Sequence, residues 1–179
     1  LGSTTQLVAD CEGRMKLIVE RDKFADAVTA AMRAADGANT IPILRNLLLK
    51  PNGATVGIAG TRLDMQLETA VDAEISGKPD DGITLPGDAL VDIVSRMPKG
   101  AQVAIEWDTL SYAHATLASG RGRYKLLSLP FADFPELMQT NKPVVFSMPG
   151  KQLAAGLTVP RFAMGKDRSR HFLQGIYMH

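Results

Sequence analysis

The chain has 179 residues, of which 45% are hydrophobic and 22% are charged, and its formal net charge is +1. This composition is typical of a globular protein and provides for one full domain and part of another. The only cysteine, Cys11, excludes an internal disulfide and a cysteine-based metal site, and it fits a reducing cytoplasm. No apolar run approaches the roughly 18 residues that a membrane-spanning helix needs, so we expect no membrane partner.

Charge is distributed unevenly along the sequence. Residues 1–14 precede a strand-like run that starts at Met15, and we interpret them as a tag or other non-native leader without a function. Residues 15–141 carry 13 Lys and Arg against 16 Asp and Glu, a net charge of −3, whereas residues 142–179 carry six against one, a net charge of +5. This basic end is either an attraction site for phosphate or a solvated surface with a few extra lysines.

The first elements are a strand and a helix. Residues 16–20 have the composition of a strand. Residues 21–35 place Phe24, Val28 and Met32 on one face at helical spacing, and the Asp-Gly pair that follows predicts the end of this helix.

Strands dominate the next part of the chain. Residues 43–50 and 55–59 predict a hairpin around Asn52-Gly53, since this pair readily adopts positive φ. Residues 65–75 alternate apolar and polar side chains, which indicates a strand with one solvent-exposed face. Residues 83–85 form a short strand that leads into a second helix from Pro86 to Met97.

Three more strands are expected at 102–107, 114–119 and 122–127. Long antiparallel runs with so few helices predict an α+β domain whose helices cover one face of the sheet. The proline-containing segment 129–140 is expected to be an interdomain connector.

A second domain is expected to begin near Lys142 and to be incomplete. A strand at 144–148, a helix at 149–162 and a strand at 175–179 repeat the opening order of the first domain. Pro160 falls within this helix and should kink or end it. The expected organisation is therefore a leader at 1–14, one domain at 15–141 and the start of a similar one at 142–179.

Several segments, in the same order and with nearly the same spacing, resemble the beta subunit of bacterial DNA polymerase III, the family of sliding clamps. They are residues 40–49, 60–65, 119–124, 132–137 and 162–175, which include the sequences Thr40-Ile41-Pro42-Ile43-Leu44 and Ala132-Asp133-Phe134-Pro135-Glu136-Leu137.

The resemblance implies three similar domains in a full-length chain and two chains that close head to tail into a ring. Antiparallel sheets would form the outside of the ring, and two helices from each domain would face the pore. The implied function is that of a DNA replication processivity factor, which encircles duplex DNA and tethers the polymerase III catalytic subunit after a clamp loader has acted. The alternative is a truncated, clamp-like interaction protein without sliding activity.

The resemblance also implies sites for DNA and for partners. Duplex DNA would be held through phosphates, without base reading, by basic and aromatic residues of the inner helices and of one loop. These candidates are Lys23, Arg33, Arg96, Lys99, Lys151, Arg161, Lys166, Arg168, Arg170, His171 and Phe172. Each could instead be an ordinary surface residue. Leu173 matches a groove residue that receives partner peptides, or it is a plain core leucine.

Three positions depart from the implied pattern. Ala38 and Asp88 stand where a basic residue can contact DNA, and Asp167 stands where the family can offer an uncharged amide. Arg45, Arg62, Arg121 and Arg123 either compensate for this loss of positive charge or do not.

Catalysis is not expected. None of the three histidines lies in a recognisable nucleophile or metal motif, and the acidic residues of the loops have the usual pattern of solvated carboxylates. The sequence therefore predicts a protein without an enzymatic activity, a cofactor or a metal.

Overall fold

The computed structural model describes residues 13–35, 41–63, 65–77, 82–135, 145–165, 169 and 171–178. The chain divides into two compact units, residues 1–138, called unit 1, and residues 139–179, called unit 2. Within the described ranges, no helix is long and apolar enough to cross a membrane. Of the predicted leader, only Gly13 and Arg14 are described, and Arg14 already belongs to the first strand.

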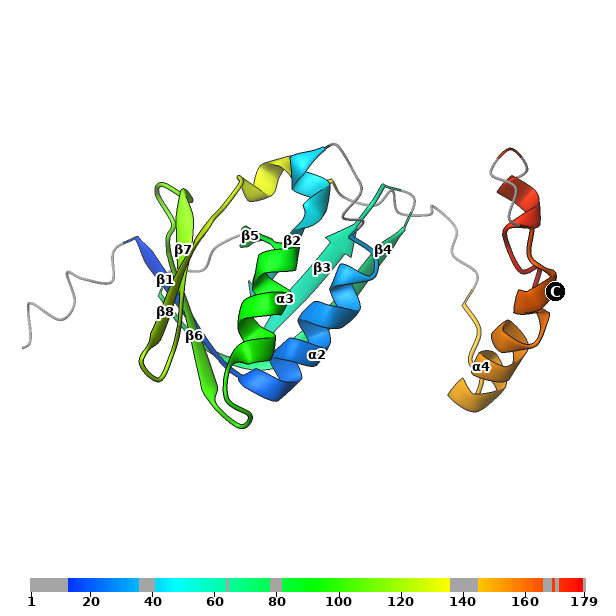
Figure 1. Ribbon diagram of the computed structural model, residues 1–179, viewed down its shortest axis with the longest axis horizontal. Helices are drawn as coiled ribbons and strands as arrows, with labels where there is room; N and C mark the ends of the chain where they lie inside the picture. The colour runs from blue at the N-terminus through cyan, green and yellow to red at the C-terminus, as the bar shows by residue number, and fades with distance from the viewer. Residues whose placement is uncertain are drawn as a thin grey trace, which may run out of the picture. The chain divides into compact units, whose positions relative to one another are not determined.

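Unit 1 is an α+β structure built on an eight-stranded antiparallel sheet (Figure 1). The strands are β1 (Arg14–Glu20), β2 (Asn46–Asn52), β3 (Thr55–Thr61), β4 (Gln66–Gly77), β5 (Ile83–Pro86), β6 (Gln102–Asp108), β7 (His114–Ser119) and β8 (Gly122–Leu127). Their spatial order is β5-β2-β3-β4-β1-β6-β7-β8. The fold class predicted from the sequence is confirmed.

Strand β4 joins the two halves of this sheet. Its residues 66–72 pair with β3 and its residues 73–77 pair with β1. At the far ends of the sheet, an isolated bridge joins Thr84 of β5 to Leu129, which follows β8. The sheet therefore curls until its two edges nearly meet.

Two helices, α2 (Arg21–Met32) and α3 (Gly87–Arg96), lie side by side on one face of the sheet (Figure 1). The guanidinium Nε of Arg21 donates to the carbonyl of Val94 at 2.9 Å, and the backbone N–H of Gly100 donates to the Asp22 carboxylate at 3.0 Å. The start of α2 thus meets the end of α3, and the two helices run antiparallel.

The core of unit 1 fills the space between this helix pair and the sheet. Phe24 and Val28 of α2 and Leu90 and Val94 of α3 are fully buried against the inward residues of the strands, among them Leu17. Each such side chain contributes about 1.5–3 kcal/mol through removal from water. The alternation of buried and exposed residues in β1 and β6 follows the period of a strand and keeps one sheet face apolar.

Two glycines allow the helices to approach their neighbours. A Cβ at Gly60 of β3 would overlap the carbonyl oxygen of Ala31 in α2, and a Cβ at Gly87 would lie 2.5 Å from the sulfur of Met32. At Gly60 the neighbouring backbone is too close for any side chain, whereas a side chain at Gly87 would require the Met32 side chain to move.

Some predicted boundaries in unit 1 were wrong. Residues 43–45 are not a strand but belong to the 3-10 helix η1 (Pro42–Arg45), because Pro42 pre-sets a helical φ and the ladder with β5 begins only at Asn46. Helix α2 ends at Met32 and not at Ala35. A further 3-10 helix, η2 (Phe131–Asp133), lies in the predicted connector, of which residues 136–140 fall outside the described residues.

Unit 2 contains helix α4 (Gly150–Thr158) and the 3-10 helices η3 (Pro160–Ala163) and η4 (His171–Leu173). The helix predicted at 149–162 is broken at Pro160, as expected, because proline lacks the N–H that the ladder would use. None of the residues whose burial is described in this unit is buried.

The two strands predicted in unit 2 were wrong for the residues described. Residues 145–149 and 175–178 have no strand structure. A strand forms only where a neighbour completes its hydrogen bonds, and the described part of unit 2 supplies no such neighbour. The strand-then-helix repeat expected from the sequence is therefore not formed here.

Candidate nucleic-acid interface

The exposed face of the helix pair carries four of the predicted DNA-contacting residues. Lys23 lies in the first turn of α2, near the end of α3 where Arg96 and Lys99 are found. Arg33 caps the opposite end of α2. All four are exposed, so the antiparallel arrangement places positive charge at both ends of the pair.

Local sequence explains why these side chains face water. In α2 the buried residues Phe24, Ala27, Val28 and Ala31 recur at helical spacing and face the core, so the charged residues Lys23 and Arg33 remain outside it. The same periodicity in α3 leaves Asp88, Asp92 and Arg96 on its outer face.

Lys23 is not a free cation. Its ammonium lies 3.3 Å from a carboxylate oxygen of Asp72 in β4 and 3.7 Å from Glu20. The hydrogen bond and charge of Asp72, with a smaller contribution from Glu20, raise the pKa of Lys23 above its ordinary value. Lys23 stays charged at neutral pH but is held beside two acids.

The outer face of α3 is equally mixed in charge. Arg96 lies 2.8 Å from Asp92, one helical turn earlier, and Arg45 of η1 lies 3.3 Å from Asp88. Asp88, expected to weaken DNA contact, therefore holds an arginine from another element. Exposed ion pairs of this kind contribute only about 0–1 kcal/mol to stability.

Arg21 and Asp22 fasten the two helices together. Arg21 donates to the carbonyls of Val94 and Ser95 and to the carboxylate of Asp22, and only 11% of its side chain is exposed. The Arg21 guanidinium, then the backbone N–H of Gly100 and the charge of Lys99, lower the pKa of Asp22 below its ordinary value. The contacts of these two residues join the helices, so we assign them a structural role and not a DNA-binding one.

Arg33 and Lys99 are the predicted contacts in unit 1 that form no ion pair with the described residues. Arg121 and Arg123 are also exposed, but they lie at the turn between β7 and β8 and in β8 itself. Ala38 falls outside the described residues.

The sequence reasoning missed the acidic partners of these cations. The four-residue spacing of Asp92 and Arg96 is a recognisable signal for an ion pair on one helix face. No comparable signal links Lys23 to Asp72 or Arg45 to Asp88, because these pairs join distant parts of the chain.

In unit 2, Lys151 lies in the first turn of α4 and Arg161 in η3, and both are exposed. The loop candidates Lys166, Arg168 and Arg170 fall outside the described residues, as does Asp167. His171 begins η4, and Phe172 beside it is 81% exposed.

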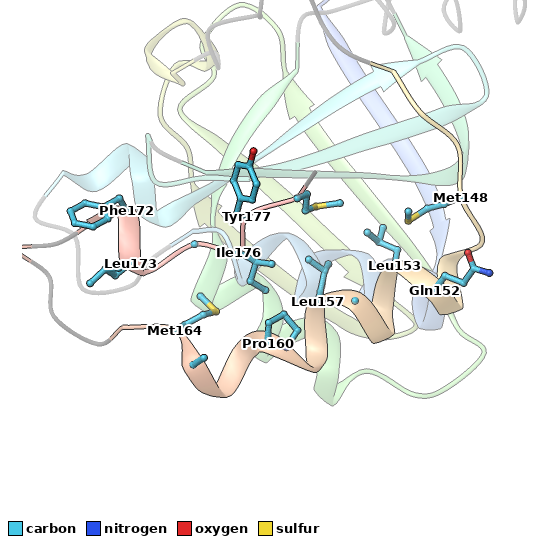
Figure 2. A pocket seen from close by; sticks show the side chains of 14 residues that line it. Met148, Gln152, Leu153, Leu157, Pro160, Met164, Phe172, Leu173, Ile176 and Tyr177 are labelled. Carbon is cyan, nitrogen blue, oxygen red and sulfur yellow. The ribbon is translucent and has the colours of Figure 1, made fainter.

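Leu173 lines an apolar cavity of about 410 Å³ within unit 2 (Figure 2). Leu153 and Leu157 of α4 lie on one side of it, and Ile176 and Tyr177 approach from the end of the described chain. The backbone N–H of Gly165 donates to the carbonyl of Leu173 at 2.7 Å. An apolar lining of this kind suits an apolar side chain, and Leu173 is the member that the sequence analysis assigned to a groove.

Among the residues that the structure describes, no group of three or more His, Cys, Asp or Glu side chains could hold a metal ion. The chemistry available at the helix pair is therefore that of exposed ammonium and guanidinium groups. Such groups attract phosphate without distinguishing bases.

Comparisons with known proteins agree with this architecture. The family model of the DNA polymerase III beta subunit, N-terminal domain, matches residues 15–138. The chain is 30% identical over 167 residues to a beta sliding clamp of Caulobacter vibrioides, and 31% identical over 162 residues to one of Escherichia coli K12. These alignments cover 92% and 90% of this chain but 44% and 43% of the relatives.

Solved structures give the same result. The sliding clamp of Bartonella birtlesii, crystallised with griselimycin, superposes with a TM-score of 0.84 at 28% identity, over 93% of this chain and 43% of that one. The clamp of C. crescentus gives 0.84 at 30% identity, over 93% and 44%. The chain thus spans less than half the length of the relatives it matches, and it belongs to the DNA polymerase III beta subunit family, whose N-terminal domain it contains.

Proposed function

We propose that this chain is part of a sliding clamp, a non-catalytic processivity factor of DNA replication that acts in the cytoplasm. The full protein would encircle duplex DNA as a ring and tether the catalytic subunit of DNA polymerase III after loading by the clamp loader. The observation that carries this proposal is the family match over residues 15–138, together with a TM-score of 0.84 to solved clamps.

The proposed organisation follows the sequence prediction. Residues 15–141 form the N-terminal clamp domain, residues 142–179 begin the central domain, and residues 1–14 carry no function. A ring of this design also needs surfaces at which chains associate with one another. The partners are therefore duplex DNA, polymerase, clamp loader and further copies of the protein.

The helix pair supplies the contacts with DNA in this proposal. Lys23, Arg33, Arg96 and Lys99 would meet backbone phosphates from both ends of the pair, since all are exposed. Contacts of this kind are weak, exchangeable and sensitive to salt. A ring can then slide, because its retention depends on topology and not on affinity.

Unit 2 would supply further contacts of the same chemical kind. Lys151 and Arg161 are proposed contacts on α4 and η3, and the loop with Lys166, Arg168, Arg170, His171 and Phe172 is proposed as a further one. Leu173 is proposed to belong to a groove for partner peptides, which is consistent with its place in the apolar cavity.

Direct binding tests the DNA contacts. The fluorescence anisotropy of two labelled linear duplexes of unrelated sequence should give dissociation constants that agree within about twofold, with affinity falling steeply as salt rises. The double variant Arg33→Ala, Lys99→Ala should weaken binding to both duplexes and reduce the salt slope by about two.

The matched control is the double variant Lys16→Ala, Lys50→Ala. Lys50 is exposed, and Lys16 is partly exposed and paired with Glu106; both lie on strands and alternate with core residues that point toward the helices. This variant loses the same charge from the other face of the sheet and should bind as the unchanged chain does. Equal losses in both variants would contradict a specific role for the helix pair.

A second experiment separates sliding from the alternative of an interaction protein. Gel filtration should show retention on circular DNA that is lost when the DNA is cut, if the chain closes around the duplex. Light scattering on the same sample gives the number of copies. A folded chain retained on neither DNA form would contradict sliding for this chain and favour the interaction protein.

A further inference from the structure

The outer face of α3 carries a row of charged residues in which two acids lie between two arginines. Asp88, Asp92 and Arg96 follow one another at four-residue spacing and are all exposed, so they form one stripe. Arg45 of η1 joins this stripe at its start through Asp88. Two carboxylates in the middle of the stripe thus lie between a cation from η1 and a cation at the end of α3.

The geometry of each pair leaves its cation engaged. Oδ1 of Asp92 accepts from Nε of Arg96 at 2.9 Å and lies 2.8 Å from a terminal nitrogen of the same guanidinium. Asp88 lies 3.3 Å from the terminal nitrogen of Arg45. These guanidinium N–H groups would otherwise be available to a phosphate, because carboxylates and phosphates both accept charge-assisted hydrogen bonds from arginine.

Asp88 also lies in the first turn of α3, where backbone N–H groups and the helix dipole favour a negative charge. Together with Arg45 it lines an open hollow of about 560 Å³ at the start of the helix. An anion arriving at this hollow meets a carboxylate already beside the arginine. The hollow is large enough to admit a phosphate, and the charge of Asp88 opposes its entry.

We infer that Asp88 and Asp92 are affinity-limiting residues, which hold Arg45 and Arg96 in the position that a DNA phosphate would otherwise occupy. The inference rests on the proposed function and specifies the strength of its DNA contact. Exposed pairs contribute little to stability, so their main effect is on an approaching polyanion. A ring that keeps its DNA by topology gains mobility when such contacts are weak.

The size of the effect follows from simple electrostatics. Removing one carboxylate about 4 Å from an arriving phosphate changes affinity by about fivefold in water. Two such removals should give at least a tenfold gain at low salt. Each arginine that becomes free to neutralise a phosphate should steepen the logarithmic salt slope by about 0.9.

The test is the double variant Asp88→Asn, Asp92→Asn of the whole chain, measured by anisotropy with a labelled linear duplex from low to moderate salt. We expect about tenfold tighter binding at the lowest salt and a salt slope steeper by up to about two. Asparagine keeps the size and the acceptor oxygen of each residue. Thermal unfolding followed by circular dichroism checks that the variant folds.

The matched control is Glu74→Gln, Glu106→Gln, which removes the same charge from exposed positions on β4 and β6. Glu106 forms an ion pair with Lys16 at 2.8 Å, so this control also breaks a pair of the same kind. Its affinity should change less than twofold. An equal gain in both variants would mean that only net charge matters and would overturn the inference.

The inference and the proposed function can fail separately. Measurable binding by the unchanged chain, with no gain in Asp88→Asn, Asp92→Asn, would overturn the inference alone. No binding by either protein at the lowest salt would overturn both.

Discussion

Unit 1 and unit 2 contain apolar residues of the same kinds but use them differently. In unit 1, Phe24, Leu90 and Ile105 are completely removed from water. In unit 2, Phe162 is 90% exposed, Val145 is 87% exposed and Tyr177 is 86% exposed. Apolar composition alone therefore does not make a core, because burial requires a second layer to pack against.

The two units also differ in how their strands and helices are supported by hydrogen bonds and packing. The strands of unit 1 are paired along the whole order of the sheet, and the helices are packed against one face of it. Helix α4 has nine residues and buries none of them. Helices shorter than about 12–15 residues are marginal in water unless tertiary packing supports them. The strands and helices of unit 1 therefore support one another, whereas the described residues of unit 2 bury none of helix α4.

The largest difference in stability between the two units is expected when one phenylalanine is truncated in each. Phe24→Ala removes a completely buried ring and should lower the free energy of unfolding by about 3–5 kcal/mol. Phe162→Ala removes an exposed ring and should change it by no more than about 0.5 kcal/mol. Urea unfolding followed by far-UV circular dichroism measures both, and the fluorescence of the buried Trp107 reports on unit 1. A large loss in the Phe162 variant would show that unit 2 has a core of its own.

A smaller effect is expected from adding one methyl group in each unit. Gly60→Ala forces a Cβ against the carbonyl of Ala31 and should cost about 1–3 kcal/mol through overpacking. Gly156→Ala lies within α4, has no atom within 4 Å of the added Cβ, and should favour the helix by about 0.5–1 kcal/mol. Thermal melts of the two variants should shift in opposite directions. A neutral Gly60 variant would mean that α2 can move away from β3.

The smallest effect concerns acid stability, which we expect to originate in unit 1. The pKa of Asp22 is lowered in the folded state, so its contact with Arg21 stabilises the fold above the ordinary value of 3.8 and is lost as pH falls through the folded pKa. In Asp22→Asn, the free energy of unfolding should therefore fall less between pH 5 and pH 3. Asp26→Asn, an exposed position on the same helix, should follow the unchanged chain. Parallel curves for all three proteins would contradict the role given to Asp22.

The sequence by itself determined the α+β class and the existence of both helices and all eight strands of unit 1. Periodicity is sufficient there because buried and exposed positions alternate regularly, as in β1 and β6. The family resemblance was confirmed by the family model that matches residues 15–138. The break of α4 at Pro160 was also predictable, because proline acts through its own missing N–H.

Other features were decided only by the tertiary structure, because a local sequence pattern does not show which segments become neighbours. Residues 145–148 belong to a predicted strand but have no strand partner among the described residues, and Pro42 converts the start of another predicted strand into η1. The candidate cations were found from the sequence, whereas their partners Asp72 and Asp88 were not. A charge is visible in a single residue, but its neutralisation depends on a carboxylate that folding brings from another element.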